Sequence, residues 1–120
     1  MNTVVFDNPI KSLPLIQQGK VRDIYAVGEA HMLIVTSDRL SAFDVVLPDP
    51  VPGKGAMLTA LSNFWFSKMA HVIPNHLADL SLEEVLPDSQ EREAVADRAI
   101  VVQKLQPLPV EAVARGYLIG

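Results

Sequence analysis

Three prolines at alternate positions constrain the fold of this chain more than any other feature of its sequence. Pro48, Pro50 and Pro52 lack the backbone N–H donor, so this stretch suits neither the interior of a helix nor the middle of a sheet. We predict an irregular, extended connection here, which ends in the glycine-rich residues 53–55.

Extended segments precede the connection. Residues 17–27 and 31–37 are rich in apolar and β-branched side chains, and residues 28–30, Gly-Glu-Ala, interrupt them. Two such runs around a short break are typical of a β-hairpin. Residues 43–47 form a further β-branched run, which we expect to be a short strand.

A helix is predicted directly after the connection. Between residues 56 and 70 the apolar side chains recur at helical spacing, and Pro74 ends the element. Residues 73–80 fit neither a helix nor a strand clearly. Three apolar residues of the helix are expected to face the core: Leu61, Phe64 and Trp65.

The last third of the chain predicts a short polar helix at residues 89–97, capped by Ser89, and two strands at 99–105 and 110–114. The order of sheet, helix and sheet predicts an α+β fold, an antiparallel β-sheet with a helix packed on it. Two residues of the polar helix are expected to face solvent: Arg92 and Glu93.

Composition excludes several classes of function. The chain has 120 residues, 49% of them hydrophobic and 20% charged, which fits one globular domain. A net charge of −4 argues against nucleic acid or anionic lipid as the default partner, so phosphate binding must be local. The absence of cysteine excludes disulfides, thiolate zinc sites and cysteine nucleophiles.

The sequence also indicates the cellular compartment of the protein and its relation to a longer polypeptide. Residues 1–10 lack the basic start and apolar run of a secretory signal, and the uncharged stretch at residues 55–67 is too short to span a bilayer. We therefore expect a cytoplasmic protein without a membrane anchor. Because the chain stops at Gly120 directly after an apolar turn, we expect it to be the N-terminal piece of a longer polypeptide.

The first candidate binding motif is Gly19-Lys-Val-Arg-Asp23. If this segment is a strand, Lys20 and Arg22 share one face beside a flexible glycine. A lysine point charge and an arginine fork so placed suit a triphosphate. The alternative is an edge strand that its charges protect from pairing.

The octet Ser37-Asp-Arg-Leu-Ser-Ala-Phe-Asp44 gathers hydroxyls and carboxylates between two apolar runs. Asp38 and Asp44 could hold a magnesium ion or orient a polar substrate, and the hydroxyl of Ser41 could reach a phosphate or carboxylate oxygen. The alternative is a turn whose side chains bond to their own backbone.

Two further places could receive an anion. Lys54, between two glycines, precedes the predicted helix, where free amides and the helix dipole attract negative charge; a simple linker would look the same. Arg115, followed by a glycine, can approach an anionic ligand, although it could equally pair with Glu111. The three histidines lack metal-ligand spacing, and we assign them no role.

These motifs, in this order, resemble the SAICAR synthetase family of purine biosynthesis. The strongest match is Leu108-Pro-Val-Glu-Ala-Val-Ala-Arg-Gly-Tyr-Leu-Ile-Gly120, and the segments beginning at Gly19, Ser37 and Pro52 support it. The resemblance implies an ATP-dependent ligase that uses Mg²⁺ and joins L-aspartate to an aminoimidazole carboxylate ribonucleotide. It implies that residues 1–120 form an ATP-binding lobe similar to the small lobe of protein kinases.

The resemblance also implies roles for particular residues, with the metal-binding carboxylates in the absent C-terminal part and no catalytic residue assigned. ATP would contact Gly19, Lys20, Val21 and Arg22 with its phosphates, and Lys104 and Leu105 with its adenine. The other substrates would contact Ser41, Asp44, Lys54, Glu111 and Arg115. A fragment with half a cleft should be inactive alone. The alternatives are a non-catalytic nucleotide-binding module or a kinase-like phosphotransferase lobe.

Overall fold

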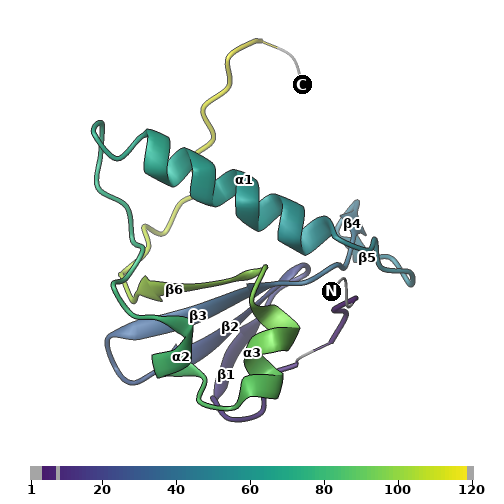
Figure 1. Ribbon diagram of the computed structural model, residues 1–120. Coiled ribbons are helices and arrows are strands. Elements are labelled where there is room, and N and C mark those ends of the chain that lie inside the picture. Colours follow the sequence, from purple (N-terminus) through teal and green to yellow (C-terminus); the bar gives the residue numbers. More distant parts are fainter. Residues whose placement is uncertain (1–3, 8, 119–120) are drawn as a thin grey trace.

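A four-stranded antiparallel sheet forms the centre of the protein (Figure 1). The computed structural model describes residues 4–7 and 9–118. The strand order is β1-β2-β3-β6, and each strand is antiparallel to its neighbours. The strands are β1 (Leu15–Gln18), β2 (Arg22–Val27), β3 (His31–Thr36) and β6 (Ala99–Gln103).

The extended segment expected at residues 17–27 is in fact two strands joined by a tight turn. The turn closes where the amide of Gly19 donates to the carbonyl of Arg22 over 2.7 Å. Lys20 lies in this turn while Arg22 begins β2, so the prediction that both share one strand face is wrong. The expected hairpin of β2 and β3 is confirmed, and Gly28 makes its turn with φ +62°.

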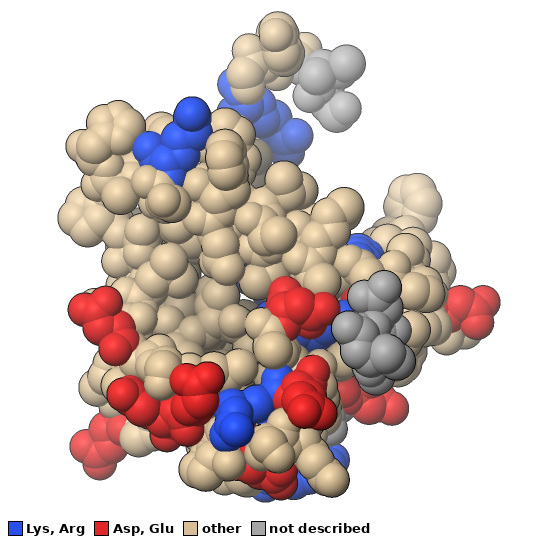
Figure 2. Space-filling model, viewed as in Figure 1, with Lys and Arg blue, Asp and Glu red and all other residues tan. Residues whose placement is uncertain are grey.

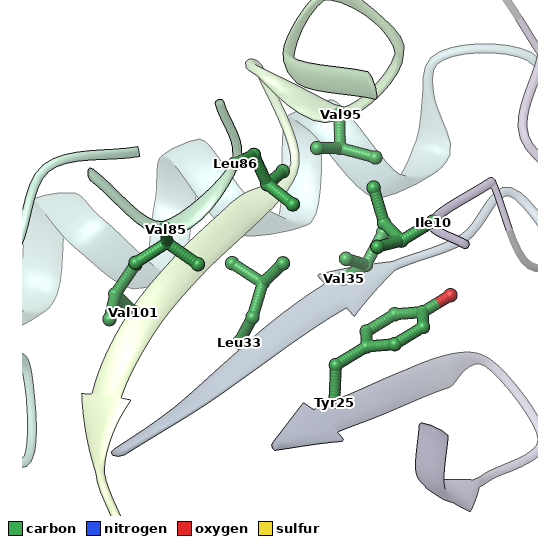
Figure 3. Close-up of a cluster of buried hydrophobic side chains, with 8 residues drawn as sticks. All are labelled: Ile10, Tyr25, Leu33, Val35, Val85, Leu86, Val95 and Val101. Carbon is green, nitrogen blue, oxygen red and sulfur yellow. The ribbon is translucent and has the colours of Figure 1, made fainter. Parts of the chain in front are cut away.

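One face of the sheet carries the hydrophobic core (Figure 3). Tyr25, Leu33 and Val35 point to this face, as the two-residue period of a strand requires. The N-terminal segment covers it with Ile10, together with two short helices, α2 (Leu82–Val85) and α3 (Ser89–Val95). The side chains from these helices and the loop between them are Val85, Leu86 and Val95.

The short helices differ in detail from the prediction. Four-residue α2 lies outside every predicted element, and α3 is capped by Asp88, whose carboxylate accepts from the amide of Gln90, rather than by Ser89. Glu93 is exposed as expected. Arg92 is half-buried, because its guanidinium donates to the carbonyls of Leu86 and Pro87, both over 2.8 Å.

Helix α1 (Lys54–Lys68) crosses the other side of the sheet and begins two residues before the predicted start (Figure 1). The residues that it buries are Gly55 and Thr59. The three residues expected in the core are instead 51–54% exposed, so that prediction is wrong: Leu61, Phe64 and Trp65. The apolar residues are spread around the helix, and the two residues that it buries fully are small or polar, Gly55 and Thr59.

Two other predicted strands are corrected. Residues 43–47 contribute only β5 (Val45–Val46), which pairs with β4 (Ser41–Ala42). Phe43 and Asp44 form the two-residue turn between them with φ of 51° and 63°, conformations that a strand cannot contain. Residues 110–114 form no strand, and the described tail from residue 104 onward is exposed throughout. No helix among the described residues is long and apolar enough to cross a bilayer.

A buried carboxylate joins α1 to the sheet. Oδ1 of Asp38 accepts from Nη1 of Arg98 over 2.6 Å and from the amide of Gly55 over 2.8 Å, and Oδ2 accepts from the amide of Val5 over 3.1 Å. Burial alone raises the pKa of Asp38, but these hydrogen bonds outweigh burial and hold the pKa below its ordinary value. Since Asp38 is fully buried and engaged on both oxygens, it is not available to magnesium or substrate.

Replacement of Gly55 by alanine should destabilise the protein strongly. The new Cβ would overlap the carbonyl oxygen of Thr36 and lie 2.7 Å from that of Ser37. We expect Gly55→Ala to lower the free energy of unfolding, measured in urea, by about 3 kcal/mol. The control is Gly53→Ala, which meets open space at φ +80° and should cost only about 1 kcal/mol. Equal losses would contradict the close packing of α1.

Acid should weaken the protein through Asp38. Because the pKa of Asp38 is lower in the folded chain than in the unfolded one, its contribution is complete above the ordinary value of 3.8 and disappears as pH falls through the folded value. Urea unfolding between pH 6 and pH 2.5 should therefore show a steep loss that Asp38→Asn makes shallower. At pH 6 this variant should already be weaker by about 3 kcal/mol, since it leaves a buried guanidinium without its counter-charge.

The control for this measurement is Asp49→Asn, at an exposed position, which should keep the steep decline of the unsubstituted protein. A decline that is the same in all three proteins would show that Asp38 does not govern acid stability.

Candidate functional site

A buried arginine fixes the turn that carries the first candidate motif. Nε of Arg39 donates to the carbonyl of Lys20 over 2.9 Å, and Nη2 donates to that of Gly19 over 3.3 Å. Nη1 donates to the carbonyl of Phe6, and Nη2 pairs with Asp23 over 2.8 Å. Because both carbonyls of the turn are held from inside the protein, the backbone of residues 19–20 is fixed.

The side chains of Lys20 and Asp44 meet on the outside of this turn. They form an ion pair, although both are exposed. The hydrogen bond and the positive charge of Lys20 lower the pKa of Asp44. The structure thus brings together Lys20, which we expected to bind ATP, and Asp44, which we expected to bind another substrate. Asp44 reaches Lys20 because it lies in the β4–β5 turn, where its φ is positive.

A groove of about 330 Å³ lies between α1 and the sheet, beside the turn. Arg22 contributes a cation, and Thr36, Ser62 and Asn63 contribute polar groups. A cation surrounded by hydroxyl and amide groups suits an anionic ligand. The other lining residues are Val21, Ile34, Leu58, Thr59 and Ile100.

A second groove, of about 420 Å³, lies farther along the same face of the sheet. Its floor is apolar, with Ile24 and Met32 from the central strands and Ile16 from β1. Lys104 and Leu105 stand at its edge, so the structure places these two predicted adenine contacts beside a cavity suited to a flat ring. The remaining lining residues are Gln17, His76, Gln103 and Pro107.

The backbone at this edge is partly engaged. The amide of Lys104 donates to the carbonyl of Ala30 over 2.8 Å and is not free for a ligand. The amide of Leu105 makes no hydrogen bond within the described part of the chain. Of the two residues, Leu105 therefore offers the donor that an adenine nitrogen requires.

The predicted substrate residues are divided between two regions. Ser41 and Asp44 lie in the β4–β5 hairpin, and half-buried Lys54 opens α1. Glu111 and Arg115 lie in the exposed tail, and no ion pair joins them in residues 9–118. The structure does not bring the tail residues to the turn by any described contact.

Sequence reasoning did not predict that Arg39, Asp23 and Arg98 support the site from beneath, although the first two lie within the motifs identified above. All three are buried, and the signal that could have found them is the presence of charges next to strongly apolar strands. The buried hydroxyl of Tyr25 lies in the same layer, and burial, followed by the neighbouring Asp23, raises its pKa.

A divalent cation has no complete site in this part of the protein. The described residues include no group of three or more carboxylate, histidine or cysteine side chains placed to hold a metal ion. Asp44, the exposed carboxylate of the octet, is paired with Lys20. The residues present therefore do not fit a bound Mg²⁺ by themselves.

Comparison with known proteins agrees with the resemblance of the motifs. The sequence model of the SAICAR synthetase family matches residues 15–120. The phosphoribosylaminoimidazole-succinocarboxamide synthase of Thioalkalivibrio sulfidiphilus is 58% identical over 120 residues, which are 100% of this chain and 40% of that protein. The chain thus spans about two-fifths of the length of this curated relative.

Solved structures give the same result. A SAICAR synthase matches with a TM-score of 0.88 and 35% identity, over 98% of this chain and 42% of that protein. A second, from Saccharomyces cerevisiae and complexed with SAICAR, has a TM-score of 0.71 and 36% identity, over 85% and 36% of the two chains. The predicted α+β fold with an antiparallel sheet is confirmed, and the chain belongs to the SAICAR synthetase family.

Proposed function

We propose that the complete protein joins L-aspartate to the carboxylate of 5-amino-1-(5-phosphoribosyl)imidazole-4-carboxylate at the expense of ATP, and that this chain is its ATP-binding lobe. The observation that carries the proposal is the turn at residues 19–20, whose carbonyls Arg39 holds. It lies directly before Arg22, which lines the groove between α1 and the sheet, and the apolar groove lies farther along the same sheet face. The SAICAR complex of the yeast relative supports the identity of the product.

The chemistry requires activation, because a carboxylate is a poor electrophile. In the proposed reaction the carboxylate oxygen attacks the γ-phosphorus of ATP, which gives an acyl phosphate and ADP. The amine of aspartate then attacks the acyl carbon, loses a proton, and expels inorganic phosphate as the amide bond forms. Both steps gain mainly from positioning and from neutralised charge.

In this proposal the two grooves bind the two ends of ATP. Adenine occupies the 420 Å³ groove against Leu105, and the phosphates extend toward Arg22 and Lys20. The backbone of Gly19 and Val21 lets the phosphates approach closely. Phosphate oxygens would compete with Asp44 for Lys20, so ATP binding releases the carboxylate of Asp44 toward the second substrate.

The remaining assignments are also proposals. Ser41 and Lys54 contact the imidazole nucleotide from the hairpin and the start of α1, and Arg115, with Glu111 beside it, receives the ribose phosphate once the rest of the protein holds the tail. The carboxylates for Mg²⁺ come from the part of the synthase outside this chain, and the ion supplies further charge neutralisation at the phosphates.

Substitutions in the complete synthase should separate the two phosphate-binding roles. We expect Lys20→Ala to raise the KM for ATP at least tenfold with a smaller effect on the ribonucleotide, because a charge-assisted hydrogen bond contributes about 1.5–3 kcal/mol. Arg115→Ala should do the reverse. Steady-state kinetics with each substrate varied in turn provide the measurement.

The control is Lys11→Ala, which removes an exposed lysine of the N-terminal segment and should change neither KM. If both active-site variants affected ATP and the ribonucleotide equally, the assignments of Lys20 and Arg115 would be wrong.

The isolated 120-residue chain should form no SAICAR. It lacks a metal site among its described residues, and its tail is not held near the turn. Chromatographic detection of product after incubation with ATP, Mg²⁺, aspartate and the ribonucleotide measures this, with the complete synthase as the positive control. Product formed by the chain alone would refute the proposal that it is one lobe of a larger site.

A further inference from the structure

Helix α1 leaves part of its apolar surface uncovered. Gly55 and Thr59 are buried, and Leu58 and Ser62 line the groove against the sheet. Leu61 and Phe64, in contrast, are 51% and 54% exposed. A helix on the surface of a globular protein normally turns its apolar stripe toward the core. We call the exposed apolar set the outer face of α1; its members are Met57, Leu61, Phe64 and Trp65, each 51–56% exposed.

The outer face carries no acidic group. The charged residues of α1 are Lys54 and Lys68, one at each end. Phe64 and Trp65 meet edge to face with centroids 5.2 Å apart, and Nζ of Lys68 lies 5.8 Å from the Phe64 ring. In Figure 2 the surface over α1 is almost entirely free of charge, while acidic residues gather over the layer of α2 and α3. An aromatic, uncharged surface of this kind matches the core of a permanent interface.

We propose that the part of the synthase polypeptide lying outside this chain packs against the outer face of α1. About three-fifths of the length of the Thioalkalivibrio protein lies outside the part that this chain matches, since the chain accounts for 40% of it. That length is sufficient for a further domain with its own core. The covering partner is therefore supplied within one polypeptide and in equal amount.

The tail supports this choice of partner. Its apolar residues are also uncovered, so a second apolar surface leaves the sheet on the segment that continues toward Gly120. One body of protein joined to this tail would cover both surfaces. The exposed apolar residues of the tail are Leu105, Leu108, Val110, Val113, Tyr117 and Leu118.

Covering the outer face would also affect the candidate site, because α1 is linked to it by buried contacts. The amide of Gly55 donates to Asp38, and the next residue, Arg39, holds the turn at residues 19–20. Packing on the outer face would fix the helix from its second side and so fix the position of Lys54 relative to the turn. The outer face is thus an assembly surface rather than a ligand site.

Thiol accessibility in the complete synthase tests the proposal. Leu61→Cys places a thiol on the outer face, and Glu93→Cys places the matched control on exposed α3. This segment has no cysteine of its own, so mass spectrometry of its peptides reads each new thiol separately. We expect maleimide to label position 61 at least tenfold more slowly than position 93, and both equally in denaturant. Equal rates in the native protein would overturn the proposal.

A cross-linking experiment identifies the partner. A photoreactive benzoyl-phenylalanine replaces Phe64 in a mixture of ¹⁴N- and ¹⁵N-labelled synthase. Cross-links to peptides outside this segment, always of the same isotope, are the expected result. Cross-links of mixed isotope would show that a second copy covers α1 and would overturn the proposal. Neither readout depends on turnover, so each stands apart from the proposed reaction.

Discussion

The carboxylate of Asp38 is the contact on which the rest of the structure depends. It joins three separate parts of the chain, since it accepts from Val5 in the N-terminal segment, Gly55 at the start of α1 and Arg98 just before β6. Gly55 can approach only because it has no side chain. A buried ion pair does not stabilise a protein much beyond an apolar contact of the same size, but removal of one partner is costly. Its role here is to define one arrangement of helix and sheet.

The neighbouring Arg39 fixes the turn at residues 19–20, as Asp38 fixes the start of α1. It satisfies two carbonyls of the turn and pairs with Asp23, which lies inside the sheet layer. In the proposed function, the cation Lys20 is therefore presented by a backbone that is already held in place before ATP binds. Preorganised charge of this kind is more effective than the same charge on a mobile loop.

Apolar and β-branched runs predicted β3 and β6 and, within one longer segment, β2, whereas helical spacing predicted α1. It could not say that Leu61 is half exposed, because exposure depends on how α1 docks on the sheet, and the contact of Gly55 with Asp38 sets that docking. The expected strand at residues 43–47 failed because Phe43 adopts a positive φ, which only pairing with β4 reveals. For the site, the family resemblance indicated Lys20 and Leu105, and these assignments stay predictions. The composition of the octet suggested a ligand's role for Asp38, because its buried partners are distant in sequence.

Asp38 and Arg39 are consecutive residues, and this adjacency has a mechanical effect. One peptide bond joins Asp38, which holds the start of α1, to Arg39, which holds the turn at residues 19–20. The helix and the turn consequently behave as one rigid unit, since neither shifts relative to the other without breaking a buried charged contact. In the proposed function, displacements during turnover would be absorbed in the exposed tail and in the β4–β5 hairpin, whose turn residues Phe43 and Asp44 are exposed.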